Sequence, residues 1–299
     1  MILSLNNTIR KFKDFLSYFI PDKIIIKHKF YKRFGYKLNL KNPCTYNEKA
    51  QWQKLYDRNP LYTNMVDKYK ARFIVEQKIG NNYLIPLLGH WNTFDEIDFD
   101  SLPQKFVLKT THDSGGVWII EKNNVDLNQI KKEVVKHLKK NFFWASREWP
   151  YKNVKPSIIA EKFMVDESGV DFKDYKFYCF NGKVKLLMIA SDINTTEHVN
   201  NHKSHEYTLM DYYDENLDNV KINWGFNFSE NPGPLPSNIN ELKQIAEKLS
   251  EGINSVRVDL YTDLNNIYFG EFTFYDGAGF DKIEPIEWDY KLGSYITIV

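Results

Sequence analysis

Two short segments near the C-terminus carry charged side chains at a spacing that suits metal and phosphate chemistry. Arg257 and Asp259 are separated by one residue, as are Glu271 and Thr273. Because alternate residues of a β-strand share one face, a hairpin of the two segments would bring one carboxylate from each strand together. Two carboxylates beside an arginine suit Mg²⁺ and the phosphates that it neutralises. A surface ladder of opposite charges across a hairpin would explain the same pattern, so these segments alone leave both interpretations open.

A lysine at the end of a predicted strand comes directly before a small, glycine-containing turn. The strand is predicted over 105–109 and ends at Lys109, and the turn that follows ends in Ser114, Gly115 and Gly116. Backbone N–H groups of such a turn, together with one ammonium group, can bind phosphate oxygens. The Gly-Lys-Ser of the Walker pattern is missing, and an ordinary hairpin turn is the simpler interpretation of this segment by itself.

A third segment, over 158–164, predicts a strand that leads into Glu161 and Lys162. Its backbone groups and the Glu161 side chain can face the edge of an adenine ring. Runs of this kind are common in ordinary strands, so the segment by itself does not indicate a function.

Hydrophobic periodicity predicts the elements that would position these residues. Residues 1–60 have helical, basic and aromatic character, and the rest mixes strands and helices without βαβ repetition, which indicates an α+β fold. A hairpin over 173–190 is expected to turn at Asn181-Gly182, and 200–235 is expected to be polar and irregular. The remaining predicted helices are 67–79 (ended by Gly80), 126–141 and 238–251, and the remaining strands are 83–88, 117–121, 157–165, 256–261 and 267–275.

The composition limits the classes of protein that remain. The 299 residues carry 40 basic and 39 acidic side chains, a formal net charge of +1, which argues against duplex DNA as a partner. Two cysteines predict no disulfide framework and indicate a reducing cytosol. The N-terminus lacks the features of a signal peptide or a spanning helix. Its apolar stripe, which is predicted to pack on the chain's own core and not on a membrane, consists of Ile9, Phe12, Phe15, Leu16 and Phe19.

The three segments occur in one order, and with further blocks they resemble the ATP-grasp superfamily, most closely the TupA-like ATP-grasp family of bacterial surface-polysaccharide loci. The resemblance extends from about residue 42 to the C-terminus and includes IGNNYLIPLLG, FVLKTTHDSGG, SIIAEKF, KDYKFYCFNGK, VRVDLY, YFGEFTFYDGAGF and EWDYKLG. It implies a helical N-terminal region over 1–60 and an ATP-grasp domain over 61–299. In that domain, two α+β subdomains (about 104–164 and about 165–299) would grip ATP, and the last hairpin would hold Mg²⁺.

The resemblance also implies roles on the nucleotide side. Lys109 resembles the strand lysine that contacts the α- and β-phosphates, and Lys176, with Asp174 beside it, resembles a second lysine on the phosphate side. A carboxylate after the hinge, Asp166 or Glu167, would hold the ribose. The phosphate-covering loop is represented by His112, Ser114, Gly115 and Gly116, and the adenine-reading hinge by Glu161, Lys162 and Met164.

On the reacting side, Arg257 resembles the contact to the γ-phosphate and the acyl-phosphate, and Asp259 and Glu271 resemble the Mg²⁺ ligands. Thr273, which belongs to the same metal set, stands where many superfamily members have asparagine. Asp276 stands where a proline is expected.

The resemblance implies a cytoplasmic, ATP-dependent carboxylate–amine ligase that acts through an acyl-phosphate, with ATP and Mg²⁺ as cofactors and no nucleic-acid partner. The setting of the family implies sugar-derived carboxylate and amine substrates, such as a uronic acid and an amino acid of a capsular polysaccharide precursor. It also implies peripheral association with polysaccharide machinery at the inner face of the membrane. Two alternatives stay open: a glycosyltransferase with Asp98 and Asp100 as an Asp-x-Asp metal motif, and a non-catalytic nucleotide-binding module.

A segment with three histidines, His198, His202 and His205, can bind a transition metal, but its polar and irregular character favours a solvated or substrate-facing loop. Within it, His202 and Lys203 resemble a family segment and are expected near the acceptor. Asp98 and Asp100 lie in an acidic run that is expected to form a solvated loop.

Overall fold

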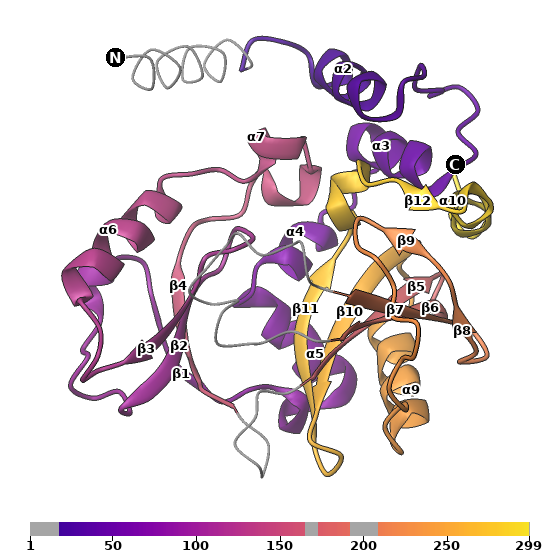
Figure 1. Ribbon diagram of the computed structural model, residues 1–299. Coiled ribbons are helices and arrows are strands. Elements are labelled where there is room, and N and C mark those ends of the chain that lie inside the picture. The colour runs from indigo at the N-terminus through magenta and orange to yellow at the C-terminus, as the bar shows by residue number, and fades with distance from the viewer. Residues whose placement is uncertain (1–17, 165–172, 192–208, 299) are drawn as a thin grey trace.

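Two antiparallel β-sheets form the framework of the protein (Figure 1). The computed structural model describes residues 18–164, 173–191 and 209–298. Helices cover the two sheets separately, and the N-terminal helices lie together with the C-terminal helix at one end of the molecule (Figure 1). The longer helices are α2 (Asp22–Phe34), α3 (Tyr46–Tyr56), α5 (Lys70–Ile79), α6 (Leu127–Leu138), α9 (Ile239–Ser250) and α10 (Ile286–Ser294).

The four-stranded sheet has the order β1-β4-β2-β3, and each pair of neighbours is antiparallel. One face packs on α6 through a core that includes Phe106, Leu108, Ile120 and Val134. The predictions of the second and third strands are confirmed. The strands are β1 (Leu87–Trp91), β2 (Lys105–Thr110), β3 (Val117–Glu121) and β4 (Ile158–Lys162).

The first strand begins later than predicted. Over 83–88 the sequence predicts a strand, but β1 starts only at Leu87. A 3₁₀ turn, η1 (Asn81–Tyr83), occupies the start of this segment. Pro86 has no N–H to donate to a neighbouring strand, although its carbonyl accepts from Lys162 N (3.0 Å). The apolar run therefore enters the sheet only after the proline.

The helix predicted from Asp67 also begins later, at Lys70. The short helix α4 (Leu61–Val66) comes first, and the Asp67 carboxylate then accepts from the N–H groups of Tyr69 (3.0 Å) and Lys70 (3.3 Å). Asp67 therefore acts at the start of α5 instead of inside it. The predicted end at Gly80 is confirmed, since its N–H donates to Glu76 O (3.0 Å).

The six-stranded sheet has the order β11-β10-β5-β6-β7-β8, again with antiparallel neighbours. The predicted hairpin is confirmed: it turns at Asn181 (φ 50°) and Gly182 (φ 75°), the two positive φ values that this type of turn requires. Helices α5 and α9 contribute to the core on one face of the sheet. The strands are β5 (Lys173–Phe180), β6 (Lys183–Ser191), β7 (Leu209–Asp214), β8 (Asn219–Val220), β10 (Ser255–Thr262) and β11 (Ile267–Thr273).

The prediction of an irregular segment over 200–235 is wrong for β7, which lies inside the sheet between β6 and β8. Tyr212 belongs to the core on one face of the sheet, and Tyr213 belongs to the core on the other face. Because tyrosines fill both faces, the strand lacks the apolar–polar alternation that identifies a half-buried strand. The part of the segment before residue 209 lies outside the described residues.

A small aromatic core covers the second face of the large sheet. It includes Tyr178 and Tyr212 of the sheet and Trp224 of the short strand β9 (Asn223–Trp224). Trp224 stacks on Tyr178 with ring centroids 4.9 Å apart. Strand β12 (Ile283–Glu284) pairs with β9, and α10 and α3 complete this side of the molecule.

The N-terminal helices hold the turn that follows β11. This turn, η5 (Asp276–Gly279), accepts hydrogen bonds from buried polar side chains of α3. Gln51 Nε2 donates to Gly279 O (2.6 Å), and Lys54 Nζ donates to Ala278 O (2.8 Å). Helix α3 therefore packs on the region predicted as the ATP-grasp domain, and the boundary at residue 60 stays a prediction.

The predicted N-terminal apolar stripe lies largely outside the described residues, which include only Phe19, a side chain that is 74% exposed. Within 18–164, 173–191 and 209–298, no helix is long and apolar enough to cross a membrane.

Candidate active site

A cavity of about 260 Å³ gathers most of the residues predicted for nucleotide and metal binding. The four-stranded sheet contributes β2, β4 and the turn after β2, and the six-stranded sheet contributes β5, β10 and β11. The cavity therefore lies where the two sheets face each other. The predicted residues that line it are Lys109, Ser114, Gly115, Glu161, Asp174, Lys176, Asp259 and Glu271.

Glu161 joins two cations on the side of the four-stranded sheet. Its buried carboxylate accepts from Lys109 Nζ (2.7 Å) and from Arg72 Nη1 of α5 (2.7 Å). Arg72 Nη2 also donates to Ile85 O (2.8 Å). Both carboxylate oxygens of Glu161 are thus bound by cations, and this side chain joins α5 to β2 at the cavity.

The turn after β2 is fixed by the buried side chain of Asp113. Its carboxylate accepts from Thr110 Oγ1 and lies 2.5 Å from Nδ1 of His137 on α6. Lys68 Nζ donates to the Asp113 carbonyl. Contacts from Thr110, His137 and Lys68 therefore fix the turn that lines the cavity in the absence of a ligand.

Two residues predicted in the phosphate-covering loop are not among those that line the cavity. His112 is buried, and its Nε2 lies 3.1 Å from His137 O. Burial lowers the pKa of His112, so the neutral imidazole is favoured. Gly116 closes the turn, since its carbonyl accepts from Thr110 N (2.9 Å).

On the six-stranded sheet, alternate residues of two paired strands face the cavity. Asp259 of β10 is opposite Lys176 of β5, and Tyr261 is opposite Asp174. Lys176 Nζ donates to Asp259 Oδ2 (2.7 Å) and to the Asp174 carboxylate. Burial acts to lower the pKa of Lys176, but Asp174 and Asp259 outweigh it and raise this pKa, so the lysine stays charged. Burial raises the pKa of Asp174 to about 6.

Arg257 is held by carboxylates on both edges of its guanidinium group. Nε and Nη2 donate to Asp259 (2.7 and 2.8 Å), and Nη1 donates to Asp276 (2.6 Å). Asp276, which stands where a proline is expected in the family, also accepts from Tyr178 Oη. Nη2 lies 3.5 Å from Glu271. The arginine is thus fixed beside the cavity and close to both predicted metal ligands.

A β-bulge shapes the predicted metal hairpin. Val258 pairs with Phe272 and Leu260 pairs with Phe269, so two residues of β11 stand opposite the single residue Asp259. One of the two is Gly270, where a Cβ would lie 2.8 Å from the Tyr261 ring and 3.1 Å from Asp259 O. Glycine is therefore required by close approach, and the bulge turns the next residue toward the cavity.

The donor set of this hairpin fits Mg²⁺. Glu271 is partly exposed at the cavity and accepts from Thr273 Oγ1 (3.3 Å), and Asp259 lies on the facing strand. Mg²⁺ is bound in proteins by one or two carboxylates, with phosphates and waters completing its shell. Within the described residues no group of three or more His, Cys, Asp or Glu side chains suits a metal ion.

The other predicted residues lie away from the cavity or outside the described residues. Lys162 is exposed at the end of β4, and Met164 is half-buried just after it. Asp98 and Asp100 are exposed in a turn in which Asp98 Oδ1 accepts from Asp100 N (3.1 Å), and neither lines the cavity. The residues outside the described ranges are Asp166, Glu167, His198, His202, Lys203 and His205.

Among the charged residues and tyrosines that line the cavity, Lys68, Arg72 and Tyr261 were not predicted from the sequence. Arg72 lies in the first turn of α5 and Lys68 in the turn before that helix, so no regular spacing in the sequence identifies the pair. Tyr261 continues the alternation of Arg257 and Asp259 along β10, so its position could have been predicted from the same pattern.

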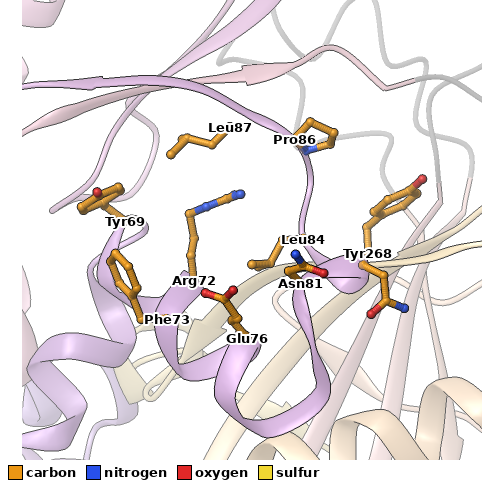
Figure 2. Close-up of a pocket in the computed structure, with 10 residues that line it drawn as sticks. Tyr69, Arg72, Phe73, Glu76, Asn81, Leu84, Pro86, Leu87 and Tyr268 are labelled. Atoms are coloured by element: carbon orange, nitrogen blue, oxygen red, sulfur yellow. The ribbon is translucent and has the colours of Figure 1, made fainter.

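A second cavity, of about 600 Å³, lies next to the first (Figure 2). Arg72 lines both cavities. Figure 2 shows its side chain in the second cavity, with Tyr69, just before α5, and Phe73 of α5 on one side and Tyr268 of β11 on the other. Arg72 therefore separates the candidate site from a wider opening.

The chain belongs to the TupA-like ATP-grasp family, because the model of that family matches residues 48–297. The match confirms the family and the α+β ATP-grasp fold class predicted from the sequence. No curated protein matches the chain.

Several solved structures are similar in fold. A D-alanine–D-alanine ligase from Bacillus anthracis is 15% identical, with 70% of this chain and 57% of that chain covered and a TM-score of 0.39. The D-alanine–D-alanine ligase from Helicobacter pylori is 15% identical, with 84% and 69% covered and a TM-score of 0.39. The ATP-grasp ligase PsnB, in complex with a precursor variant, Mg and ADP, is 8% identical, with 75% and 57% covered and a TM-score of 0.41. The chain thus spans 57% of the first of these proteins.

Proposed function

We propose that the protein is an ATP-dependent carboxylate–amine ligase that activates a carboxylate as an acyl-phosphate. The observation that carries this proposal is the meeting of cations from both sheets at one cavity. Lys109 comes from β2, Lys176 from β5, and Arg257 lies beside them on β10. Membership of the ATP-grasp family supports ATP as the ligand, and the oxygen ligands Asp259, Glu271 and Thr273 support Mg²⁺.

In the proposed reaction, an oxygen of the substrate carboxylate bonds to the γ-phosphorus of ATP, and ADP leaves. The amine nitrogen then attacks the acyl carbon, and inorganic phosphate and a proton are released. Lys109 and Lys176 would hold phosphate oxygens, and Arg257 would stabilise the charge that develops on the transferred group. Bound Mg²⁺ would neutralise part of the phosphate charge. The chain's contribution is positioning and electrostatics, so no covalent protein nucleophile is needed.

We further propose sugar-derived substrates from surface-polysaccharide synthesis, such as a uronic acid and an amino acid, and a cytoplasmic reaction in association with membrane-bound machinery. The resemblance of the sequence to a family of surface-polysaccharide loci is what suggests this setting. The roles of His202 and Lys203 near the acceptor belong to the same proposal.

The products of turnover test the reaction class. An acyl-phosphate route yields ADP and inorganic phosphate, and hydroxylamine in place of the amine should trap the activated acyl group as a hydroxamate. AMP and pyrophosphate as products would contradict the mechanism. Stabilisation by a UDP-sugar with Mn²⁺, but not by ATP with Mg²⁺, would favour a glycosyltransferase instead.

A further inference from the structure

The segment over 18–36, which contains α2, exposes large apolar side chains more densely than the rest of the described chain. Of the fourteen large apolar residues that are exposed, six lie within residues 18–36. Ile24 (57% exposed) and Tyr31 (55% exposed) are seven residues apart, which places them on the same side of the helix two turns from each other. Ile20, also exposed, lies two residues before the helix, just ahead of Pro21. These three residues form the apolar line of the α2 outer face.

The helix cannot turn this face inward, because its opposite side is already packed. Ile26 and Phe30 are buried against Leu55 of α3 and against Phe280. Arg33 Nε donates to Phe280 O (2.7 Å). Figure 1 shows α2 at the edge of the molecule, with α3 between it and the large sheet. The exposed line is therefore a fixed feature of the surface.

Three exposed lysines, Lys23, Lys27 and Lys32, flank the apolar line. None of them forms an ion pair with an acidic residue in the described part of the chain. The one acidic residue of α2, Asp22, lies 3.1 Å from Arg147. The outer face is thus basic, whereas the whole chain has a net charge of only +1.

We propose that the α2 outer face docks on an anionic lipid surface. A helix that combines a basic rim with aliphatic and aromatic residues lies in the plane of a membrane interface, where its lysines meet lipid phosphates and its apolar residues enter the headgroup boundary. Neither the apolar line nor the lysines would bind a membrane alone. Three apolar side chains bury little area, and three lysines are attracted only to anionic lipid. The charge of the three flanking lysines is what commits the proposal to an anionic bilayer, because each lysine near such a surface is attracted to it.

Docking would orient the candidate active site. Phe280, which α2 contacts, directly follows η5, and η5 carries the Asp276 that binds Arg257. The buried side of α2 is therefore linked through Phe280 and η5 to the residue that positions Arg257. This orientation rests on the proposed function, whereas the docking itself rests on α2 alone.

Vesicle co-sedimentation of the full chain tests the docking separately from catalysis. The protein should sediment with vesicles of phosphatidylcholine and phosphatidylglycerol but not with phosphatidylcholine alone, and added salt should release it. The variant Lys23→Gln/Lys27→Gln/Lys32→Gln should bind about a hundredfold more weakly, since each lysine near an anionic surface contributes about fivefold. Ile24→Ser/Tyr31→Ser should also weaken binding while the lysines remain.

A matched control is available on α6, where Lys132, Lys136 and Lys139 are exposed on a helix that packs on the other sheet. Their replacement by glutamine removes the same charge and should leave vesicle binding unchanged. An unchanged melting temperature and unchanged ATP turnover in solution would show that the α2 variants are folded. Equal loss of binding in the α6 variant would overturn the proposal. So would a failure of the wild type to bind anionic vesicles, and that result would favour a protein partner for the α2 outer face.

Discussion

The carboxylate bridge at Glu161 makes a prediction that separates a structural ion pair from an adenine contact. Glu161→Gln keeps the size of the side chain but removes the charge that Lys109 and Arg72 share at 2.7 Å each. The side chain of Glu161 is 8% exposed, so water replaces little of the lost interaction. We expect the ligand-free variant to be less stable, because two cations lose their common partner in a buried place.

The size of the effect follows from the burial of the pair. Removing one partner of a buried ion pair costs about 3–5 kcal/mol. The lower value applies here, because Arg72 keeps its bond to Ile85 O (2.8 Å) and Lys109 is 19% exposed. Unfolding entropy of about 2.1 cal/mol/K per residue gives about 0.6 kcal/mol/K for this chain, so a loss of about 3 kcal/mol lowers the melting temperature by about 5 °C.

The small sheet offers a matched control in Glu121→Gln. Glu121 also pairs with a lysine, Lys105, at 2.7 Å, but both side chains are more than 40% exposed. An exposed pair contributes at most about 1 kcal/mol, which corresponds to less than about 2 °C. Thermal unfolding of both variants, with and without MgATP, is the measurement. MgATP should stabilise Glu161→Gln more than the wild type, because its phosphates supply the missing anion; equal melting temperatures for the two variants would refute the reasoning.

Three further predictions concern the six-stranded sheet. Glu271→Gln should abolish Mg²⁺-dependent ADP release without lowering the melting temperature by more than about 2 °C, because this carboxylate is partly exposed, and Asp98→Asn should leave turnover unchanged in the same assay. Asp276→Asn should lower kcat about ten- to hundredfold with little change in the KM for ATP, since Arg257 loses the negative charge that holds Nη1 at 2.6 Å; a changed KM with normal kcat would contradict this role. Burial raises the pKa of Asp174 to about 6, so its neutral form stabilises the fold at low pH and this contribution is lost as the pH rises through about 6. As the pH rises from about 4 to about 6, the wild type should therefore lose stability relative to Asp174→Asn. A difference in melting temperature between the two proteins that does not vary with pH would argue against this assignment.

The strands and the turn that carry much of the site could be predicted from patterns in neighbouring residues. Alternation placed Arg257 and Asp259 on one face of a strand, and the structure shows that strand paired with β11 as predicted. The turn at Asn181-Gly182 could be predicted because few residue pairs adopt its two positive φ values. These features depend on residues close together in the sequence, so a single sequence contains the information.

Features that depend on distant contacts could not be predicted in this way. The sequence gives no sign that Glu161 would meet Arg72, a residue 89 positions away on a helix packed against the other sheet. The buried polar face of α3 has the same origin: Gln51 and Lys54 look like surface residues until the carbonyls of η5 are placed against them. The bulge opposite Asp259 depends on the fit of Gly270 against Tyr261, which only the folded hairpin reveals.

The pairing of charges at the cavity connects the two sheets before any nucleotide binds. Arg72 belongs to α5, which packs in the core of the large sheet, and it reaches Glu161 on the small sheet. On the facing side, Asp259 is shared by Lys176 and Arg257. Each of these cations is thus held in place by a carboxylate, and a fixed cation stabilises developing phosphate charge without the cost of reorganisation. Because the Arg72–Glu161 bond spans the two sheets, a ligand that competes for Arg72 or Lys109 must also change how firmly the sheets hold each other. In the proposed function, the phosphates of ATP would compete with Glu161 for Lys109 and Arg72, and the melting temperatures of Glu161→Gln with and without MgATP would measure this competition.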